Sequence, residues 1–111
     1  MLKLDAMSKF YKKPLLFTEI GYNVNERCAM EPWAYESSDS AAAAQSQARC
    51  IEQALQLAGK YPCLAGMFWW KWMPNVRSRH RENFDMRASA LKQLIAKYWL
   101  PATPVNASAE R

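Results

Sequence analysis

Two short apolar runs, separated by a segment of helical character, constrain the fold of this chain more than any other feature. Residues 15–20 (Leu-Leu-Phe-Thr-Glu-Ile) and 64–70 (Leu-Ala-Gly-Met-Phe-Trp-Trp) have the length and composition of strands buried on both faces. Between them, a helix is predicted to begin after Asp39 or Ser40 and to end near Gly59. Two strands joined by one helix pair in parallel, so the sequence predicts an α/β fold.

The lengths of the connections are typical of a barrel. Long polar segments, 21–40 and 71–86, follow the two strands, whereas the connections into the strands are short. Further helices are predicted over residues 2–12 and 87–99. A sheet of only two parallel strands, with so few helices, would leave an apolar face uncovered. We therefore predict a partial (β/α)8 TIM barrel, its last two βα units, over residues 1–100, and a flexible tail over 101–111. The buried face of the middle helix is expected to comprise Ala44, Ala48, Ile51, Leu55 and Ala58.

Glu19 is the first candidate for a functional residue. An unpaired charge is costly inside an apolar strand, but the carboxyl end of a parallel strand is where α/β folds carry their chemistry. Simple alternation places Leu15, Phe17 and Glu19 on one face of the strand, with Leu16, Thr18 and Ile20 on the face toward the helices. The alternative is a strand-end glutamate that faces solvent or pairs with an arginine.

Aromatic residues are concentrated in and after the second strand. The chain has five tryptophans, and alternation places Phe68, Trp70 and Trp72 on one face, opposite Met67, Trp69 and Lys71. Sugars bind flat aromatic floors, and a glutamate beside such a floor suggests glycoside chemistry. Trp69 is expected to fill the core instead.

Four segments together resemble clan A glycoside hydrolases, and within that clan the β-mannanase-like family 113. They are residues 14–22 (Pro-Leu-Leu-Phe-Thr-Glu-Ile-Gly-Tyr), Glu31-Pro32-Trp33, the helix start with Gln45 and Gln47, and residues 66–72 (Gly-Met-Phe-Trp-Trp-Lys-Trp). The resemblance covers about residues 10–99 and maps onto the last two units of an eight-fold barrel. It implies a retaining hydrolase with Glu19 as nucleophile, Trp70 or Trp72 stacked under the sugar, and Trp33 and Tyr22 near the cleft.

The resemblance also exposes a departure. The acid/base glutamate of such enzymes follows an asparagine at the end of strand four, and this chain has no such strand. Retaining hydrolysis needs two carboxyl groups about 5 Å apart, and nothing in the spacing directs Glu26, Glu31 or Glu36 toward Glu19. We therefore expect the chain to be inactive alone.

Other chemistries have weak signals in this sequence. Three cysteines without a C-x-x-C spacing indicate neither a disulfide framework nor a zinc site, and we expect no metal and no cofactor. His80, the one histidine, lies between Arg79 and Arg81 in a polar segment and is interpreted as a loop residue. No run reaches about eighteen apolar residues, so no membrane span is expected.

Two other functions stay open. One is a non-catalytic carbohydrate-binding or interaction module, and the other, ranked last, is a basic nucleic-acid-binding domain built on Arg77, Arg79 and Arg81 of this chain of net charge +5. The preferred partner is an oligo- or polysaccharide substrate, with no nucleic acid and no membrane. Exposed strand edges predict possible self-association. Without a signal-peptide core at residues 1–10, a cytoplasmic location is favoured for the chain as given.

Overall fold

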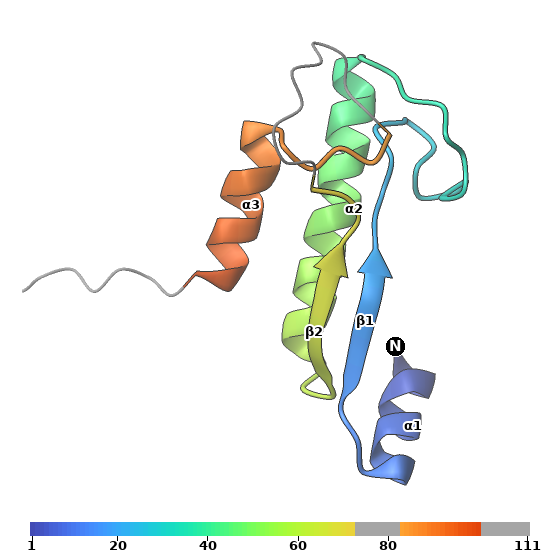
Figure 1. The fold of residues 1–111 in the computed structure, drawn as a ribbon, viewed down its shortest axis with the longest axis vertical. Helices are drawn as coiled ribbons and strands as arrows, with labels where there is room; N and C mark the ends of the chain where they lie inside the picture. The colour runs from blue at the N-terminus through green and yellow to red at the C-terminus, as the bar shows by residue number, and fades with distance from the viewer. Residues whose placement is uncertain (73–82, 101–111) are drawn as a thin grey trace, which may run out of the picture.

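The chain alternates helices and strands in the order α1 (Leu2–Tyr11), β1 (Leu15–Ile20), α2 (Ala41–Lys60), β2 (Leu64–Trp69) and α3 (Ser89–Trp99) (Figure 1). The computed structural model describes residues 1–72 and 83–100. All five elements were expected from the sequence, and their bounds agree within about two residues. Most of the basic segment with His80, and the predicted tail 101–111, lie outside the described residues.

The two strands run side by side and parallel, as the helical crossover requires (Figure 1). The register pairs Leu15 with Leu64, Leu16 with Gly66, Phe17 with Met67, and Ile20 with Trp69. This register is irregular between Phe17 and Ile20, where three residues of β1 span the length of two on β2.

That irregularity makes the expected alternation of side chains in β1 wrong. Phe17 and Ile20 both line the interface with α2, together with Ala54 and Leu57. Leu16 lies on the opposite face, next to Gly66 of β2. A Cβ added to Gly66 would be 3.3 Å from Leu16 Cδ1. Phe17 therefore does not share the side of Glu19, because the irregularity separates them.

Helix α2 begins where its cap was expected. Ser40 Oγ accepts a hydrogen bond from the backbone N–H of Ala43 at 3.0 Å, which satisfies one of the free donors of the first turn. The helix continues one residue beyond Gly59, which has no positive φ and is not its stop. Its buried face is Ala43, Gln47, Ile51, Ala54 and Leu55, turned slightly from the expected one.

The core lies on one side of the sheet only. Ile51 and Leu55 of α2 meet Met86 and Leu91, and Trp69 packs against this cluster as expected. On the other side of the sheet, Leu16 and Phe68 are exposed by 54% and 61%. The sheet thus has one covered and one open apolar face. No helix among the described residues has the length and hydropathy needed to cross a membrane.

Candidate functional site

A cavity of about 240 Å³ lies at the carboxyl ends of the two strands. Glu19 is the next-to-last residue of β1, Trp70 directly follows β2, and Trp33 comes from the segment between β1 and α2. The structure therefore brings together three residues that the sequence singled out from separate segments. The complete lining is Glu19, Gly21, Pro32, Trp33, Tyr35, Trp70 and Phe84.

The chemistry of this cavity combines one carboxylate with several aromatic faces. Glu19 is exposed, and it is the only acidic residue among those that line the cavity in the described part of the chain. Trp33 and Tyr35 are each 72% exposed, and Tyr35 meets the Phe84 ring edge-on with centroids 5.9 Å apart. Rings with open faces beside a carboxylate suit a ligand with both apolar and hydroxyl surfaces.

Close contact between the two strand ends fixes the floor of the cavity. The backbone N–H of Trp70 donates to the carbonyl oxygen of Ile20 at 2.7 Å. A Cβ on Gly21 would collide with the carbonyl oxygen of Trp70 and lie 3.2 Å from its carbonyl carbon. Glycine is therefore required at this position by space rather than by φ, and it lets Trp70 approach the end of β1. The peptide bond from Trp70 to Lys71 is cis.

A buried asparagine connects the two loops that form the walls. Asn23 is 1% exposed, and both ends of its amide are used. Its Nδ2 donates to the carbonyl oxygens of Ala34 (3.1 Å) and Glu36 (3.0 Å), and its Oδ1 accepts from the backbone N–H groups of Val24 (2.8 Å) and Phe84 (2.9 Å) and from the Ser37 hydroxyl (3.0 Å). One side chain thereby positions the backbone near Trp33, Tyr35 and Phe84.

A second buried amide supports the same arrangement from α2. Gln47, 2% exposed, donates from Nε2 to the carbonyl oxygens of Tyr22 (2.9 Å) and Asp85 (3.2 Å). Asp85 in turn accepts two hydrogen bonds from the Arg87 guanidinium, at 2.8 and 2.7 Å. Both post-strand segments are therefore tied to the helix behind the sheet.

Sequence reasoning missed Asn23, Tyr35, Phe84 and Asp85 as supports of the site. Gln47 entered only as part of the family resemblance. The available signal was weak, namely an amide between Tyr22 and Val24 at the start of a polar segment that contains many other polar side chains. The partners of that amide are up to 61 residues away, which no local pattern reveals.

Two of the predicted site residues lie outside the cavity. The Tyr22 ring packs against the core cluster, where burial raises its pKa above the ordinary value. Trp72 lies toward α3, with the Lys92 ammonium 5.7 Å from its ring centroid. Neither side chain lines the space beside Glu19.

Two carboxylates in the loop after β1, those of Glu26 and Glu31, have other partners. The Glu31 carboxylate forms an ion pair with Arg27 on the same turn. Glu26 accepts a hydrogen bond from the Ser40 hydroxyl at the start of α2, at 2.9 Å. Neither residue lines the cavity with Glu19.

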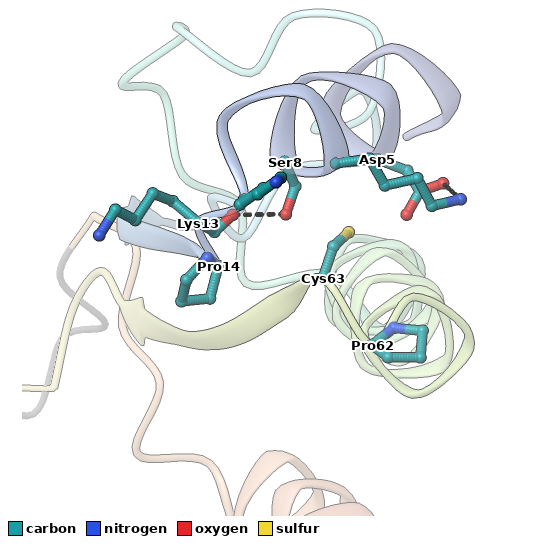
Figure 2. A pocket seen from close by; sticks show the side chains of 8 residues that line it. Asp5, Ser8, Lys13, Pro14, Pro62 and Cys63 are labelled. Atoms are coloured by element: carbon teal, nitrogen blue, oxygen red, sulfur yellow. Dashed lines mark hydrogen bonds and ion pairs between the residues drawn. The ribbon is translucent and has the colours of Figure 1, made fainter.

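A larger hollow, about 640 Å³, lies at the opposite end of the strands between α1 and the start of β2 (Figure 2). Its polar groups largely pair with one another: Lys9 with Asp5 at 2.7 Å, and the Ser8 hydroxyl with the Lys13 carbonyl oxygen. The amino ends of barrel strands serve stability rather than chemistry, so we assign the site to the smaller cavity. Within residues 1–72 and 83–100, no three His, Cys, Asp or Glu side chains form a set that could hold a metal ion.

One family model matches most of the chain. The model of Glycoside Hydrolase Family 113 matches residues 1–89, a range that includes both strands and every residue lining the cavity. No curated protein and no solved structure matches the chain. Two parallel strands with flanking helices, within a match to this family, form a partial (β/α)8 barrel. The chain belongs to glycoside hydrolase family 113.

Proposed function

We propose that this chain carries the nucleophile half of a retaining glycoside hydrolase site, with Glu19 as the nucleophile and β-linked, mannan-type sugars as substrate. The observation that carries the proposal is the grouping of Glu19, Trp33 and Trp70 around one cavity at the carboxyl ends of the strands. Glu19 would attack the anomeric carbon and form a glycosyl ester, while a second carboxyl group protonates the leaving oxygen.

The second carboxyl group is proposed to come from outside this chain. In retaining enzymes the two groups are about 5–5.5 Å apart, on either side of the scissile bond. Glu26 and Glu31 are engaged elsewhere, and none of Glu26, Glu31 and Glu36 lines the cavity. The isolated chain is therefore proposed to bind sugar without turning it over.

The size of the cavity suits a single sugar ring. At about 240 Å³ it is smaller than the roughly 300–1,000 Å³ typical of pockets for drug-sized ligands. A longer saccharide would extend from it across Trp33 and Tyr35, whose rings are mostly exposed. Trp70, 47% exposed, offers the face next to the carboxylate.

Binding of β-1,4-mannobiose and mannotriose, followed by amide chemical shifts of the isotope-labelled chain, tests the cavity. We expect shifts at Gly21, Trp33 and Trp70, and a loss of binding in Trp70→Ala. Trp72→Ala is the matched control, because Trp72 is equally exposed, at 49%, but lies outside the cavity. Equal losses in the two variants would contradict the proposed binding site.

Covalent trapping tests the role of Glu19. A 2-deoxy-2-fluoro mannoside with a dinitrophenolate leaving group needs no protonation to depart, so the absent acid is bypassed. Slow formation of a glycosyl ester is expected on Glu19 and not in Glu19→Gln. A label on another carboxylate, or equal labelling of Glu19→Gln, would refute the nucleophile assignment.

The same cavity supports a second candidate, a non-catalytic carbohydrate-binding module, because it offers aromatic faces with a single carboxylate. This alternative predicts that Glu19→Gln retains sugar binding and that no ester is trapped, whereas Trp70→Ala still abolishes binding. A nucleic-acid-binding role would depend on Arg77, Arg79 and Arg81, which lie outside the described residues. We retain the expectation that nucleic acid is not a partner.

A further inference from the structure

We propose that Cys28 and Cys50 are an oxidisable pair whose disulfide fastens the loop after β1 onto α2. Their sulfur atoms lie 3.6 Å apart although the residues are 22 positions apart in the sequence. Cys28 is 1% exposed in the loop, and Cys50 is partly exposed on α2. Both thiols are free in this structure.

The geometry requires only a small adjustment. A disulfide has an S–S length of about 2.0 Å, so the two sulfurs need to approach by about 1.5 Å. The backbone N–H of Cys28 donates to the carbonyl oxygen of Asn25 at 3.2 Å, and Cys50 lies on a twenty-residue helix, so both side chains start from defined positions. Rotation of side chains, rather than rearrangement of backbone, is the expected movement.

The location connects this pair to the site. The segment from Cys28 to Cys50 contains Pro32, Trp33 and Tyr35, which form one wall of the cavity beside Glu19. A bond between the cysteines would close this segment into a covalent ring. Oxidation would thus limit the movement of Trp33 and Tyr35, whether the site is catalytic or only binds sugar.

The bond forms by thiol–disulfide exchange with a small disulfide such as oxidised glutathione. The more accessible Cys50 thiolate attacks one glutathione sulfur, which forms a mixed disulfide and releases one glutathione thiolate. Cys28 then gives up its proton, attacks the Cys50 sulfur and expels the second glutathione. Two protein thiols are oxidised and one glutathione disulfide is reduced to two thiols, so the electrons balance. Burial, together with the neighbouring Cys50, raises the pKa of Cys28 to about 12, which favours Cys50 as the first nucleophile.

The remaining cysteine provides an internal control. Cys63 lies at the other end of the strands beside the hollow formed with α1 (Figure 2). The folded full chain would be incubated in glutathione buffers of graded oxidation, quenched with iodoacetamide and mapped by mass spectrometry without reduction. We expect one cross-linked peptide pair, joining Cys28 to Cys50, and an alkylated Cys63.

Variants make the result decisive. Cys28→Ser and Cys50→Ser should each abolish the cross-link, while Cys63→Ser should leave it unchanged. Closing a ring of this size should lower the unfolding equilibrium constant by up to about 300-fold, measured by urea denaturation of the oxidised and reduced chains. A cross-link that involves Cys63, a lasting glutathione adduct on Cys50, or an oxidised chain less stable than the reduced one would overturn the proposal.

Discussion

Replacing Asn23 with alanine should release the loops that form the cavity walls. The side chain makes five hydrogen bonds. Some of its partners have a second hydrogen bond that would remain after the substitution. The carbonyl oxygen of Glu36 also accepts from Asn25, and the Ser37 hydroxyl, which has a single proton, can donate it to Asn83 Oδ1 instead. Three backbone groups then lose the bond that Asn23 gave them: the N–H groups of Val24 and Phe84 and the carbonyl oxygen of Ala34.

The cost follows from those three groups. An unsatisfied buried donor or acceptor costs about 1–3 kcal/mol, and water that enters near the exposed Tyr35 reduces the upper end. We therefore expect Asn23→Ala to lower the free energy of unfolding by about 3 kcal/mol, well above the typical single substitution. For a small sheet with one open face, this is a large share of the total stability.

Asn25→Ala is the matched control. The Asn25 amide also donates to Glu36, at 2.9 Å, but it is more exposed, and its loss should cost less than about 1 kcal/mol. Urea denaturation gives both values, and hydrogen exchange should show faster exchange of the Val24 and Phe84 amides in Asn23→Ala only. Equal destabilisation by the two substitutions would refute the role of Asn23.

Asn23→Asp separates the two halves of the amide. The substitution keeps the size and an accepting oxygen, but it places a carboxylate against the carbonyl oxygens of Ala34 and Glu36. Because like partial charges then face each other in a buried position, the loops should be released despite the similar shape. An Asn23→Asp chain as stable as the parent would show that the two donated bonds contribute little.

Three further predictions concern the strand ends, the buried thiol and the open face of the sheet. Gly21→Ala should displace the Trp70 backbone and weaken mannotriose binding at least tenfold in a calorimetric titration, because the added Cβ collides with its carbonyl oxygen. The raised pKa of Cys28 means that the unfolded chain loses this thiol proton near pH 9 and the folded chain only near 12. The free energy of unfolding should therefore fall as the pH rises from 9 toward 12, with a smaller fall in Cys28→Ala. Self-association through the open face should appear as concentration-dependent sedimentation that Phe68→Lys reduces, since Phe68 is 61% exposed.

Much of the fold could be predicted because its determinants are local. Strand length, the Ser40 cap and the helical periodicity of residues 41–60 each depend on neighbours within a few positions. The side-chain directions in β1 were wrong because the irregular register near Thr18 comes from pairing with β2, which the sequence of β1 alone does not encode.

The residues of the candidate site likewise fall into those that the sequence could place and those that it could not. Glu19 and Trp70 could be placed because the carboxyl ends of parallel strands meet at one edge of a sheet. Trp72 was predicted from strand alternation and the family resemblance, and Tyr22 from the resemblance, yet Trp72 lies toward Lys92 and Tyr22 toward the core cluster. Those directions depend on tertiary packing rather than on any repeat.

The exposure of Glu19 and the exposure of Phe68 and Leu16 have a common physical origin. All three lie on parts of the strands that no other element of the described chain covers. A carboxylate surrounded by water has weak electrostatic interactions, whereas transition-state stabilisation needs oriented groups in a dry site. Covering the open face would therefore exclude water from Glu19 as well as bury Leu16 and Phe68. If the acid comes from outside this chain, as proposed, then a small carboxylic acid added in solution should not restore turnover, because the exposed Glu19 would also lack a dry, oriented environment.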